Sequence, residues 1–407
     1  MSDRVIINAD LKFVQGVIKA GGEDLKKCYQ CSTCTVVCPL TPEGAPFPRK
    51  EMINAQWGIK DKLIKSMDPW LCFHCNDCSE QCPRGAKPGD VMAAIRNMVI
   101  ANVAVPSFLG KATQSIGGSL ALLLVPIILI AAVIFGINGG DFGFLNNPEI
   151  DFHANMISQL TIEILFIPAF FFGVITGILG ILKLLKGLKE DYPPTEKGEA
   201  LIPAIIGTVK DVLSHSKFRE CGVNQNRNVA HMLLFYAFIG LLITTAGVTT
   251  IYYINFLNIK FGSGVALVTA TPLPFFHPIK LIGNISALAA AIGIVMIAWR
   301  RLVSDNIGKS VAFDWIFILN ILLIVTTGIL AQVTRVAGSQ IAYLIYYCHL
   351  VLVFFLFAYM PHSKFGHMFY RATALVYARY SGREKSVGMT FLEGKQQELP
   401  EETKAVA

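Results

Sequence analysis

The sequence predicts an all-α protein in two parts, a small cysteine-rich helical domain followed by a bundle of six membrane-spanning helices. The chain has 407 residues, of which 53% are hydrophobic and 15% charged, well below the ~25% charged residues of an average soluble domain. Long apolar runs begin near residue 117, while the first 110 residues are mixed in composition and lack the alternation typical of strands. We therefore expect a helical domain at 1–110, a transmembrane domain at 111–380 and a polar tail at 381–407.

Eight of the ten cysteines form two runs with identical spacing. Each run reads Cys-x2-Cys-x2-Cys-x3-Cys-Pro, from Cys28 to Cys38 and from Cys72 to Cys82. This spacing is typical of paired [4Fe–4S] clusters, in which the last cysteine of each run binds the cluster of the other run. It predicts one cluster on Cys28, Cys31, Cys34 and Cys82, and a second on Cys72, Cys75, Cys78 and Cys38. Zinc ribbons use two separated Cys-x2-Cys pairs, so four cysteines within eleven residues argue against zinc.

The residues around these runs favour short helices. The segments 49–56 and 61–67 are candidate helices, and Pro88 is expected to begin a helix through Val99, because its missing N–H is tolerated in the first turn. The first domain is thus predicted to be a helical ferredoxin-like domain. His74, inside the second run, is expected either to tune a cluster through a hydrogen bond or to be exposed.

Six stretches are long and apolar enough to cross a hydrocarbon core of about 30 Å, at roughly 117–137, 160–185, 229–254, 277–299, 314–335 and 341–362. The segment 138–158 contains no Lys or Arg, whereas 186–228, 300–313 and the tail are basic. Basic loops remain on the cytoplasmic side, and the first residues lack the pattern of a signal peptide. We therefore expect a multi-pass protein of the cytoplasmic (inner) membrane with both termini in the cytoplasm. The net charge of +7 arises largely in these loops and does not indicate a nucleic-acid partner.

Histidines in the membrane part are candidate ligands of b-type haem. His349 and His367 are eighteen positions apart, about five turns of an uninterrupted helix, so one helical face would present both at different depths. His231, at the cytoplasmic start of the third span, is expected to pair with His367, and His277, at the outer start of the fourth, with His349. His362 is expected to face elsewhere, at the interface. The alternative role for these histidines is interfacial anchoring.

Iron–sulfur clusters beside a membrane domain predict electron exchange with a membrane quinone pool. Glu163, Lys280 and Arg335 lie towards the outer ends of their spans and are candidates for a quinol site. The alternative for Lys280 and Arg335 is that they reach to the membrane interface, whereas a carboxylate at Glu163 needs a partner. The sequence has no flavin or nucleotide fingerprint, so chemistry on a soluble substrate is expected in another chain.

The two halves resemble two known groups of proteins. The cysteine runs are similar to the small iron–sulfur subunit of heterodisulfide reductases, and the segment His349 to His367, with Pro361 and Lys364, resembles the last helix of nitrate-reductase gamma-type dihaem cytochromes b. Their fusion resembles the cytochrome b-containing subunits of the quinone-interacting membrane-bound oxidoreductase complexes of sulfate reducers. One position departs from the cytochrome pattern, because Leu241 stands where that family has a histidine. Either His277 replaces it or one haem binds.

The resemblance implies a dihaem cytochrome b membrane domain that oxidises menaquinol. It also implies that electrons pass through b haems and two [4Fe–4S] clusters to flavin- and iron–sulfur-containing subunits of the same complex, and on to adenylylsulfate reductase. Two alternatives remain open at this point. In one, electrons flow the other way and a cytoplasmic donor reduces the quinone. In the other, the membrane half is a haem-free anchor for the ferredoxin-like domain.

Overall fold

The computed structural model describes residues 8–42, 45–215, 227–261, 273–303 and 308–383, and every regular element in these ranges is helical. The short helices of the N-terminal domain are α1 (Leu11–Lys19), η1 (Glu23–Lys27), α2 (Thr33–Val37), α3 (Arg49–Gln56), α4 (Lys60–Ile64), α5 (Asp68–Leu71), α6 (Asp77–Glu80), α7 (Pro88–Val103) and α8 (Ser107–Ala112). The predicted tail from residue 384 onwards lies outside the described residues.

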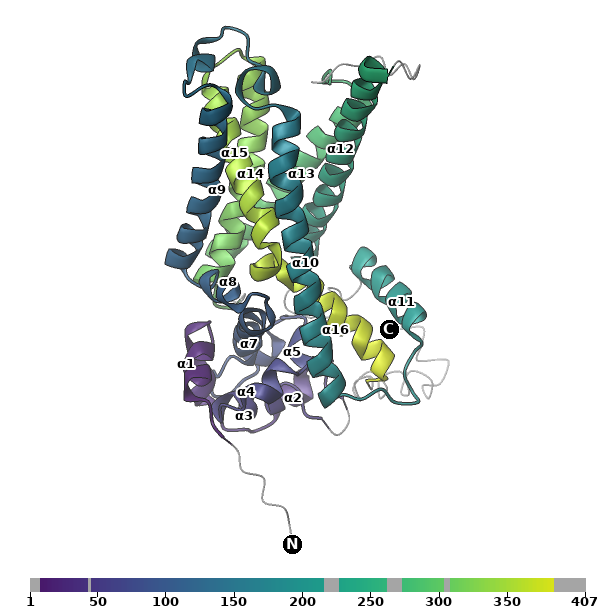
Figure 1. Ribbon diagram of the computed structural model, residues 1–407. Coiled ribbons are helices and arrows are strands. Elements are labelled where there is room, and N and C mark those ends of the chain that lie inside the picture. The colour runs from purple at the N-terminus through teal and green to yellow at the C-terminus, as the bar shows by residue number, and fades with distance from the viewer. Residues whose placement is uncertain (1–7, 43–44, 216–226, 262–272, 304–307, 384–407) are drawn as a thin grey trace, which may run out of the picture.

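The second part is a bundle of long helices that stands on the N-terminal domain (Figure 1). Its elements are α9 (Ile116–Ile137), η2 (Gly143–Asn146), η3 (Phe152–Met156), α10 (Gln159–Asp191), α11 (Leu201–Ser214), α12 (Arg227–Phe261), α13 (Pro278–Val303), α14 (Ala312–Val336), α15 (Ile341–Tyr359), η6 (Met360–His362), η7 (Lys364–Gly366) and α16 (His367–Ser381). Within the described ranges, six helices are long and apolar enough to cross a membrane: α9, α10, α12, α13, α14 and α15. They correspond within a few residues to the six stretches expected from the sequence.

Local sequence explains where several helices begin. The Asp10 side chain accepts a hydrogen bond from the backbone N–H of Phe13 at 2.9 Å, which caps α1. Ser115 caps α9 in the same way through the N–H of Gly118, at 3.1 Å. Pro88 stands at the start of α7, as predicted, because the first turn needs no N–H from it.

The bundle and the N-terminal domain share one hydrophobic core. Helix α10 is 33 residues long and extends beyond the bundle along the N-terminal domain, where it buries Leu184 and Leu188 (Figure 1). Helix α16 buries Tyr370 and Tyr377 in the same core. The rings of Tyr370 and Trp70 lie 5.6 Å apart, and both side chains are fully buried. The two parts of the chain are therefore joined by packing as well as by sequence.

The expectation of one uninterrupted helix from 341 to beyond His367 was wrong. Helix α15 ends at Tyr359, two 3-10 turns follow, and a separate helix α16 begins at His367. Pro361 lies in the first of these turns, where its missing N–H and its ring end the α-helical ladder. Ser363 is extended and accepts a hydrogen bond from the N–H of Phe365 at 3.2 Å. His349 and His367 therefore do not share one helical face.

Candidate functional site: two cysteine cavities and a polar cavity

The two cysteine runs have the same unusual backbone. In each run the second and fourth residues after the first cysteine have positive φ: Gln30 (61°) and Ser32 (71°) in the first, His74 (53°) and Asn76 (71°) in the second. Residues other than glycine seldom adopt this conformation. It turns successive N–H groups into a concave surface that suits an anionic group. The repeat indicates that both runs are shaped for the same cofactor.

The structure brings the eight cysteines together in two sets of four. Cys28, Cys31, Cys34 and Cys82 line one cavity, which we call the first cysteine cavity. Cys38, Cys72, Cys75 and Cys78 line the other, the second cysteine cavity. Each cavity thus has three cysteines from one run and the last cysteine of the other, which is the grouping that crossed ligation of paired clusters requires.

The sulfur atoms suit a cluster better than a single ion. Among the described residues, no three His, Cys, Asp or Glu side chains are gathered closely enough to hold one metal ion. Desolvation and the neighbouring cysteines raise the pKa of Cys34 to about 11, and desolvation with Cys72 raises the pKa of Cys38 to about 12. These thiols are protonated at neutral pH, so binding of iron must displace their protons.

The two cavities differ in their surroundings. In the first, Cys31 is exposed, and Tyr29 is 67% exposed with the Arg84 guanidinium 4.1 Å from its ring centre. In the second, Cys72 is buried in the core that the N-terminal domain shares with α10 and α16. Its carbonyl accepts a hydrogen bond from Arg96 at 3.4 Å. The first cavity therefore has an exposed cysteine and an exposed tyrosine at its edge, whereas the second contains a cysteine buried in the core shared with α10 and α16.

His74 also lines the second cysteine cavity. The backbone N–H of His74 donates to the sulfur of Cys72 at 3.3 Å, and its side-chain Nε2 lies 3.8 Å from Oδ1 of the buried Asp90. A hydrogen bond to a ligand sulfur stabilises negative charge on that sulfur, so His74 is placed to tune the group that Cys72 holds.

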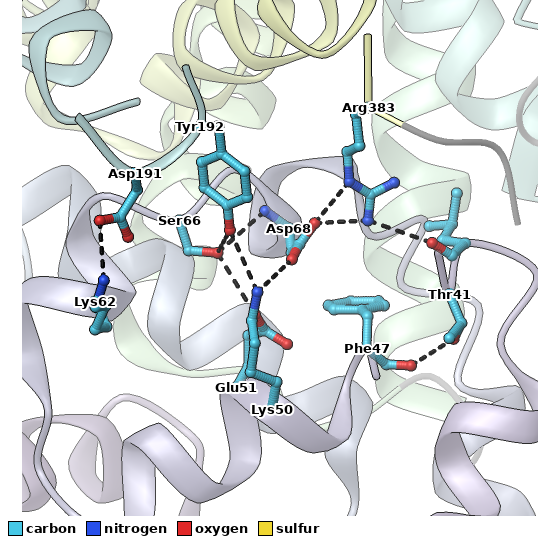
Figure 2. A network of polar contacts seen from close by, with 11 residues as sticks. Thr41, Phe47, Lys50, Glu51, Lys62, Ser66, Asp68, Asp191, Tyr192 and Arg383 are labelled. Carbon is cyan, nitrogen blue, oxygen red and sulfur yellow. Dashed lines mark hydrogen bonds and ion pairs between the residues drawn. The ribbon is translucent and has the colours of Figure 1, made fainter. Parts of the chain in front are cut away.

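A buried polar network joins the N-terminal domain to the ends of α10 and α16 (Figure 2). Asp68 is 1% exposed and lies between Lys50 and Arg383, with N–O distances of 3.2 and 2.6 Å. Tyr192, just beyond α10, has its hydroxyl 3.4 Å from the Lys50 amine. Glu51 is fully buried in the same network, 3.5 Å from that amine. Sequence patterns alone did not single out these residues, which come from four separate segments.

Glu51 makes the stability of this junction depend on pH. Burial, and then the nearby Asp68, raise the pKa of the Glu51 carboxyl far above its ordinary 4.5. The folded protein keeps a proton that the unfolded chain has already released, so stability falls as the pH rises from about 5 towards the folded pKa. Oε2 of Glu51 has no hydrogen-bond partner in the described part of the chain. We expect Glu51→Gln, which resembles the protonated carboxyl in shape, to remove this loss and to raise the unfolding temperature at about pH 8.

Thermal unfolding of the full chain at about pH 6 and about pH 8 tests this expectation. Glu190→Gln is the matched control, because Glu190 is exposed and pairs with Lys65 across the same junction at 2.5 Å. That variant should change stability little at either pH. An equal loss of stability at both pH values in Glu51→Gln would contradict the protonated state of Glu51.

Two of the predicted haem ligands have their Nδ1 atoms directed at backbone carbonyls. His367 Nδ1 lies 2.7 Å from the carbonyl oxygen of Lys364, and His349 Nδ1 lies 3.1 Å from that of Ile324. A carbonyl only accepts, so Nδ1 carries the proton in both rings and Nε2 keeps its lone pair, which is the form of histidine that ligates metals. Desolvation and the charges of Lys364, Arg371 and Arg96 lower the pKa of His367 to about 4.

The other histidines have varied surroundings. Nδ1 of His231 lies 3.0 Å from Nε2 of His215, a neighbour that the sequence did not indicate. His277 has a buried Nδ1 with no hydrogen-bond partner among the described residues. His362, expected at the interface, is instead fully buried. Its Nε2 lies 3.0 Å from the carbonyl of Val105, because the 3-10 turn carries it against the segment before α8.

A third cavity, of about 230 Å³, lies between α13, α14, α15 and the turn η3, and we call it the polar cavity. Its lining residues are Asp151, Phe152, His153, Lys280, Gly328, Ala331, Gln332, Arg335, Tyr346 and His349. A Cβ atom on Gly328 would come within 3.0 Å of His349 Cε1, so glycine allows the imidazole to lie against α14. The polar cavity thus brings together three predicted site residues, Lys280, Arg335 and His349.

Two residues predicted for the outer side of the membrane domain, Glu163 and His277, do not line the polar cavity, whereas two titratable loop residues that were not predicted as site residues do. Glu163 accepts hydrogen bonds from Gln159, at 2.9 Å, and from Tyr253, which supplies the partner that a carboxylate there needs. His277 is also absent from the lining. Asp151 and His153 reach the cavity from η3 and its cap, in a segment that the sequence identified as an acidic loop. Sequence reasoning missed these two residues because they lie in a loop, and helical periodicity does not indicate which residues a loop contacts.

Comparison with known proteins agrees with the cysteine geometry. Residues 24–86 match the 4Fe-4S dicluster domain family. The chain is 35% identical over 111 residues to the C-type subunit of the H(2):CoB-CoM heterodisulfide,ferredoxin reductase of Methanothermobacter marburgensis, which is 27% of this chain and 57% of that protein. It is 36% identical over 107 residues to a protein of Archaeoglobus profundus that is similar to the C-type subunit of heterodisulfide reductase, 26% of this chain and 57% of the relative.

These matches span little more than half the length of the relatives. No solved structure matches the chain. The N-terminal part is therefore a 4Fe–4S dicluster domain like that of the C-type subunits of heterodisulfide reductases, with eight cysteines for two [4Fe–4S] clusters, and six long apolar helices follow it.

Proposed function

We propose that this chain is a membrane electron-transfer subunit that oxidises menaquinol and passes the electrons through its two [4Fe–4S] clusters to a cytoplasmic partner. The observation that carries the proposal is the position of the second cysteine cavity. Arg96 donates a hydrogen bond to the carbonyl of Cys72, and Cys72 lies in the same buried core as Tyr370 of α16, the helix that begins at His367. A cluster ligand and the helix that begins with a candidate haem ligand thus meet in one core at the junction of the two parts.

The four-cysteine cavities support an order for the clusters. Cys72 of the second cysteine cavity is buried in the core shared with α10 and α16, and the first cavity has the exposed Cys31 and Tyr29 at the surface. We infer that electrons enter the cluster of Cys38, Cys72, Cys75 and Cys78, and leave from the cluster of Cys28, Cys31, Cys34 and Cys82. The partner would be a flavin- and iron–sulfur-containing subunit, with adenylylsulfate reductase as the downstream acceptor.

Haem b is part of the proposal on the cytoplasmic side, with His231 and His367 as its ligands. The Nδ1 contacts of both rings support it, since they hold each imidazole in a defined orientation. When bound, haem supplies a one-electron carrier between quinol and clusters. A second haem needs a partner for His349, and His277 does not line the cavity next to that residue. The haem count per chain therefore tests the predicted His277–His349 pair.

The polar cavity is our candidate for the quinol site. Oxidation of a quinol to a quinone releases two electrons and two protons, so the site needs donors to hold the ring oxygens and groups that accept protons. Lys280 and Arg335 are suitable donors, and the Asp151 carboxylate and the His153 imidazole are suitable acceptors. Burial lowers the pKa of His153, so its ring is neutral and able to take a proton.

A redox titration of the isolated chain, with haem and iron counts and visible spectra, tests the electron pathway. We expect the absorption of b-type haem and about eight iron atoms in clusters per chain. His367→Ala should remove the cytoplasmic-side haem while leaving the cluster iron in place. A wild-type spectrum without b-type haem absorption would eliminate the haem route and leave the N-terminal clusters with a membrane anchor only.

The quinol site has its own test. Lys280→Met should raise KM for a soluble quinol analogue by about 10- to 100-fold, because a charge-assisted hydrogen bond contributes ~1.5–3 kcal/mol. Glu163→Gln is the control, because Glu163 points into a separate set of contacts with Gln159 and Tyr253. If Glu163→Gln raises KM by about 10- to 100-fold and Lys280→Met leaves KM unchanged, the polar cavity is not the quinol site.

A further inference from the structure

The four cysteines of the second cysteine cavity come from two chain segments that are separated in sequence. Cys72, Cys75 and Cys78 come from the segment that follows α5, and Cys38 comes from the end of the first run. Leu40, two residues after Cys38, also lines this cavity. A cluster bound by cysteines of both segments requires a fixed distance between the segments. A contact that holds one segment to the other therefore affects the cluster.

Arg383 makes that tie. Its Nη2 atom donates a hydrogen bond to the carbonyl of Leu40 at 3.3 Å, and the same nitrogen lies 2.6 Å from Oδ1 of Asp68. Its Nε donates to that Asp68 oxygen at 2.9 Å. Asp68 begins α5, and its carbonyl accepts the N–H of Cys72 at 3.2 Å. One guanidinium therefore joins the segment after Cys38 to the segment before Cys72 (Figure 2).

The surroundings give this contact a fixed geometry. Asp68 is 1% exposed and the Arg383 side chain 12% exposed, so water screens the pair little. The planar guanidinium presents several N–H groups in a rigid fork, which a lysine amine does not. Lys50 lies 3.2 Å from the other Asp68 oxygen and keeps the carboxylate partly neutralised. Of the two cations beside Asp68, Lys50 and Arg383, it is thus Arg383 that contacts both the segment after Cys38 and the segment before Cys72.

Arg383 comes from the far end of the chain. It lies two residues beyond α16, after Gly382, whose positive φ of 72° ends that helix. Helix α16 is held against the N-terminal domain by Tyr370 and Tyr377 in the shared core. The element that follows the membrane bundle thus returns to the N-terminal domain and carries a charged residue to the edge of the second cysteine cavity.

We propose that Arg383 is a positioning residue for the [4Fe–4S] cluster of Cys38, Cys72, Cys75 and Cys78, so that the chain completes this cluster site only when α16 has docked. The proposal rests on the two clusters and not on the haem or quinol assignments. Arg383 does not ligate the cluster. It holds Leu40 and Asp68 together, and these two residues set the distance between the crossing cysteine Cys38 and the three cysteines of the second run.

The test compares Arg383→Gln, Arg383→Lys and Arg379→Gln in the full-length protein. Arg379 is the matched control, because it lies on α16 and pairs with Glu199 and Asp211, at 3.2 and 2.9 Å, rather than with the N-terminal domain. The readouts are iron and sulfide per chain, and the electron paramagnetic resonance spectrum and midpoint potential of each reduced cluster.

We expect Arg383→Gln to lose up to about half of its iron, or to keep it with an altered signal and potential of one cluster only. Arg379→Gln should match the wild type in every readout. Arg383→Lys keeps the positive charge opposite Asp68, so we expect this variant to fold even if Arg383→Gln does not accumulate. In Arg383→Lys the resonance signal of the same cluster should be altered, because a lysine amine cannot contact both Leu40 and Asp68 as the guanidinium does. Wild-type signals and potentials for both clusters in either Arg383 variant would overturn the proposal. If the wild-type chain holds two clusters but oxidises no quinol, the proposed function is wrong and the role of Arg383 is unaffected.

Discussion

Replacing Cys38 with alanine is expected to remove the cluster of the other run, that of Cys72, Cys75 and Cys78, and to spare the cluster next to Cys38 in sequence. The reason is that Cys38 lines the second cysteine cavity and has no place in the lining of the first. A [4Fe–4S] cluster that loses one of four thiolates is labile, so about four of about eight iron atoms should be lost.

The measurement is the resonance spectrum of the cluster that remains, compared among four single alanine variants. Cys38→Ala should leave the same signal as Cys75→Ala, and Cys82→Ala the same signal as Cys31→Ala. These pairings separate crossed from uncrossed ligation even where both clusters are weakened. If the Cys38→Ala signal instead matches that of Cys31→Ala, each run binds its own cluster and the crossed assignment is wrong.

The second large effect is expected from Trp70→Ala, at the junction of the N-terminal domain with α16. Trp70 and Tyr370 are both fully buried with ring centres 5.6 Å apart. Removal of a buried tryptophan costs about 3–5 kcal/mol through lost burial and the cavity left behind. Because Trp70 lies two residues before Cys72, loosening of this contact should also make the clusters easier to lose on heating.

Thermal unfolding followed by the visible absorption of the clusters measures this effect. Trp70→Phe should be much milder, because Trp70 Nε1 has no hydrogen-bond partner among the described residues and an aromatic ring is kept. Trp57→Ala is the control for loss of a tryptophan, since Trp57 is 53% exposed and its removal should change stability by no more than about 0.5 kcal/mol. Equal effects of Trp70→Ala and Trp57→Ala would show that α16 does not depend on this contact.

Some site residues were predictable because their signals are local. Ligands of an iron–sulfur cluster must lie a few residues apart on a tightly turned chain, so the spacing of Cys28 to Cys38 already indicates the cofactor. The cap of α1 and the start of α7 at Pro88 were similarly readable, since one side chain or one missing N–H decides each.

Other residues could not be found in this way because their partners are distant. Arg383 and Asp68 are 315 positions apart, and nothing around either one indicates the other. His153 reaches the cavity that His349 lines only through the fold of an irregular segment. The pairing of His349 with His367 on one face failed because Pro361 breaks the helix between them, and periodicity extends only as far as the helix does.

By itself, the sequence determined the composition of this protein's parts: eight cysteines in two equal runs, and six helices apolar enough to cross a membrane. Cofactor spacing and hydropathy are properties of neighbouring residues, so they can be read without the fold. Only the tertiary structure decided how the parts meet. It brought α10 and α16 back into the core of the N-terminal domain and carried Arg383 to the segment beside the second cysteine cavity, while its grouping of the cysteines agrees with the one that their spacing predicts. The contacts of α10, α16 and Arg383 join segments that are distant in sequence, where packing rather than local pattern determines which residues become neighbours.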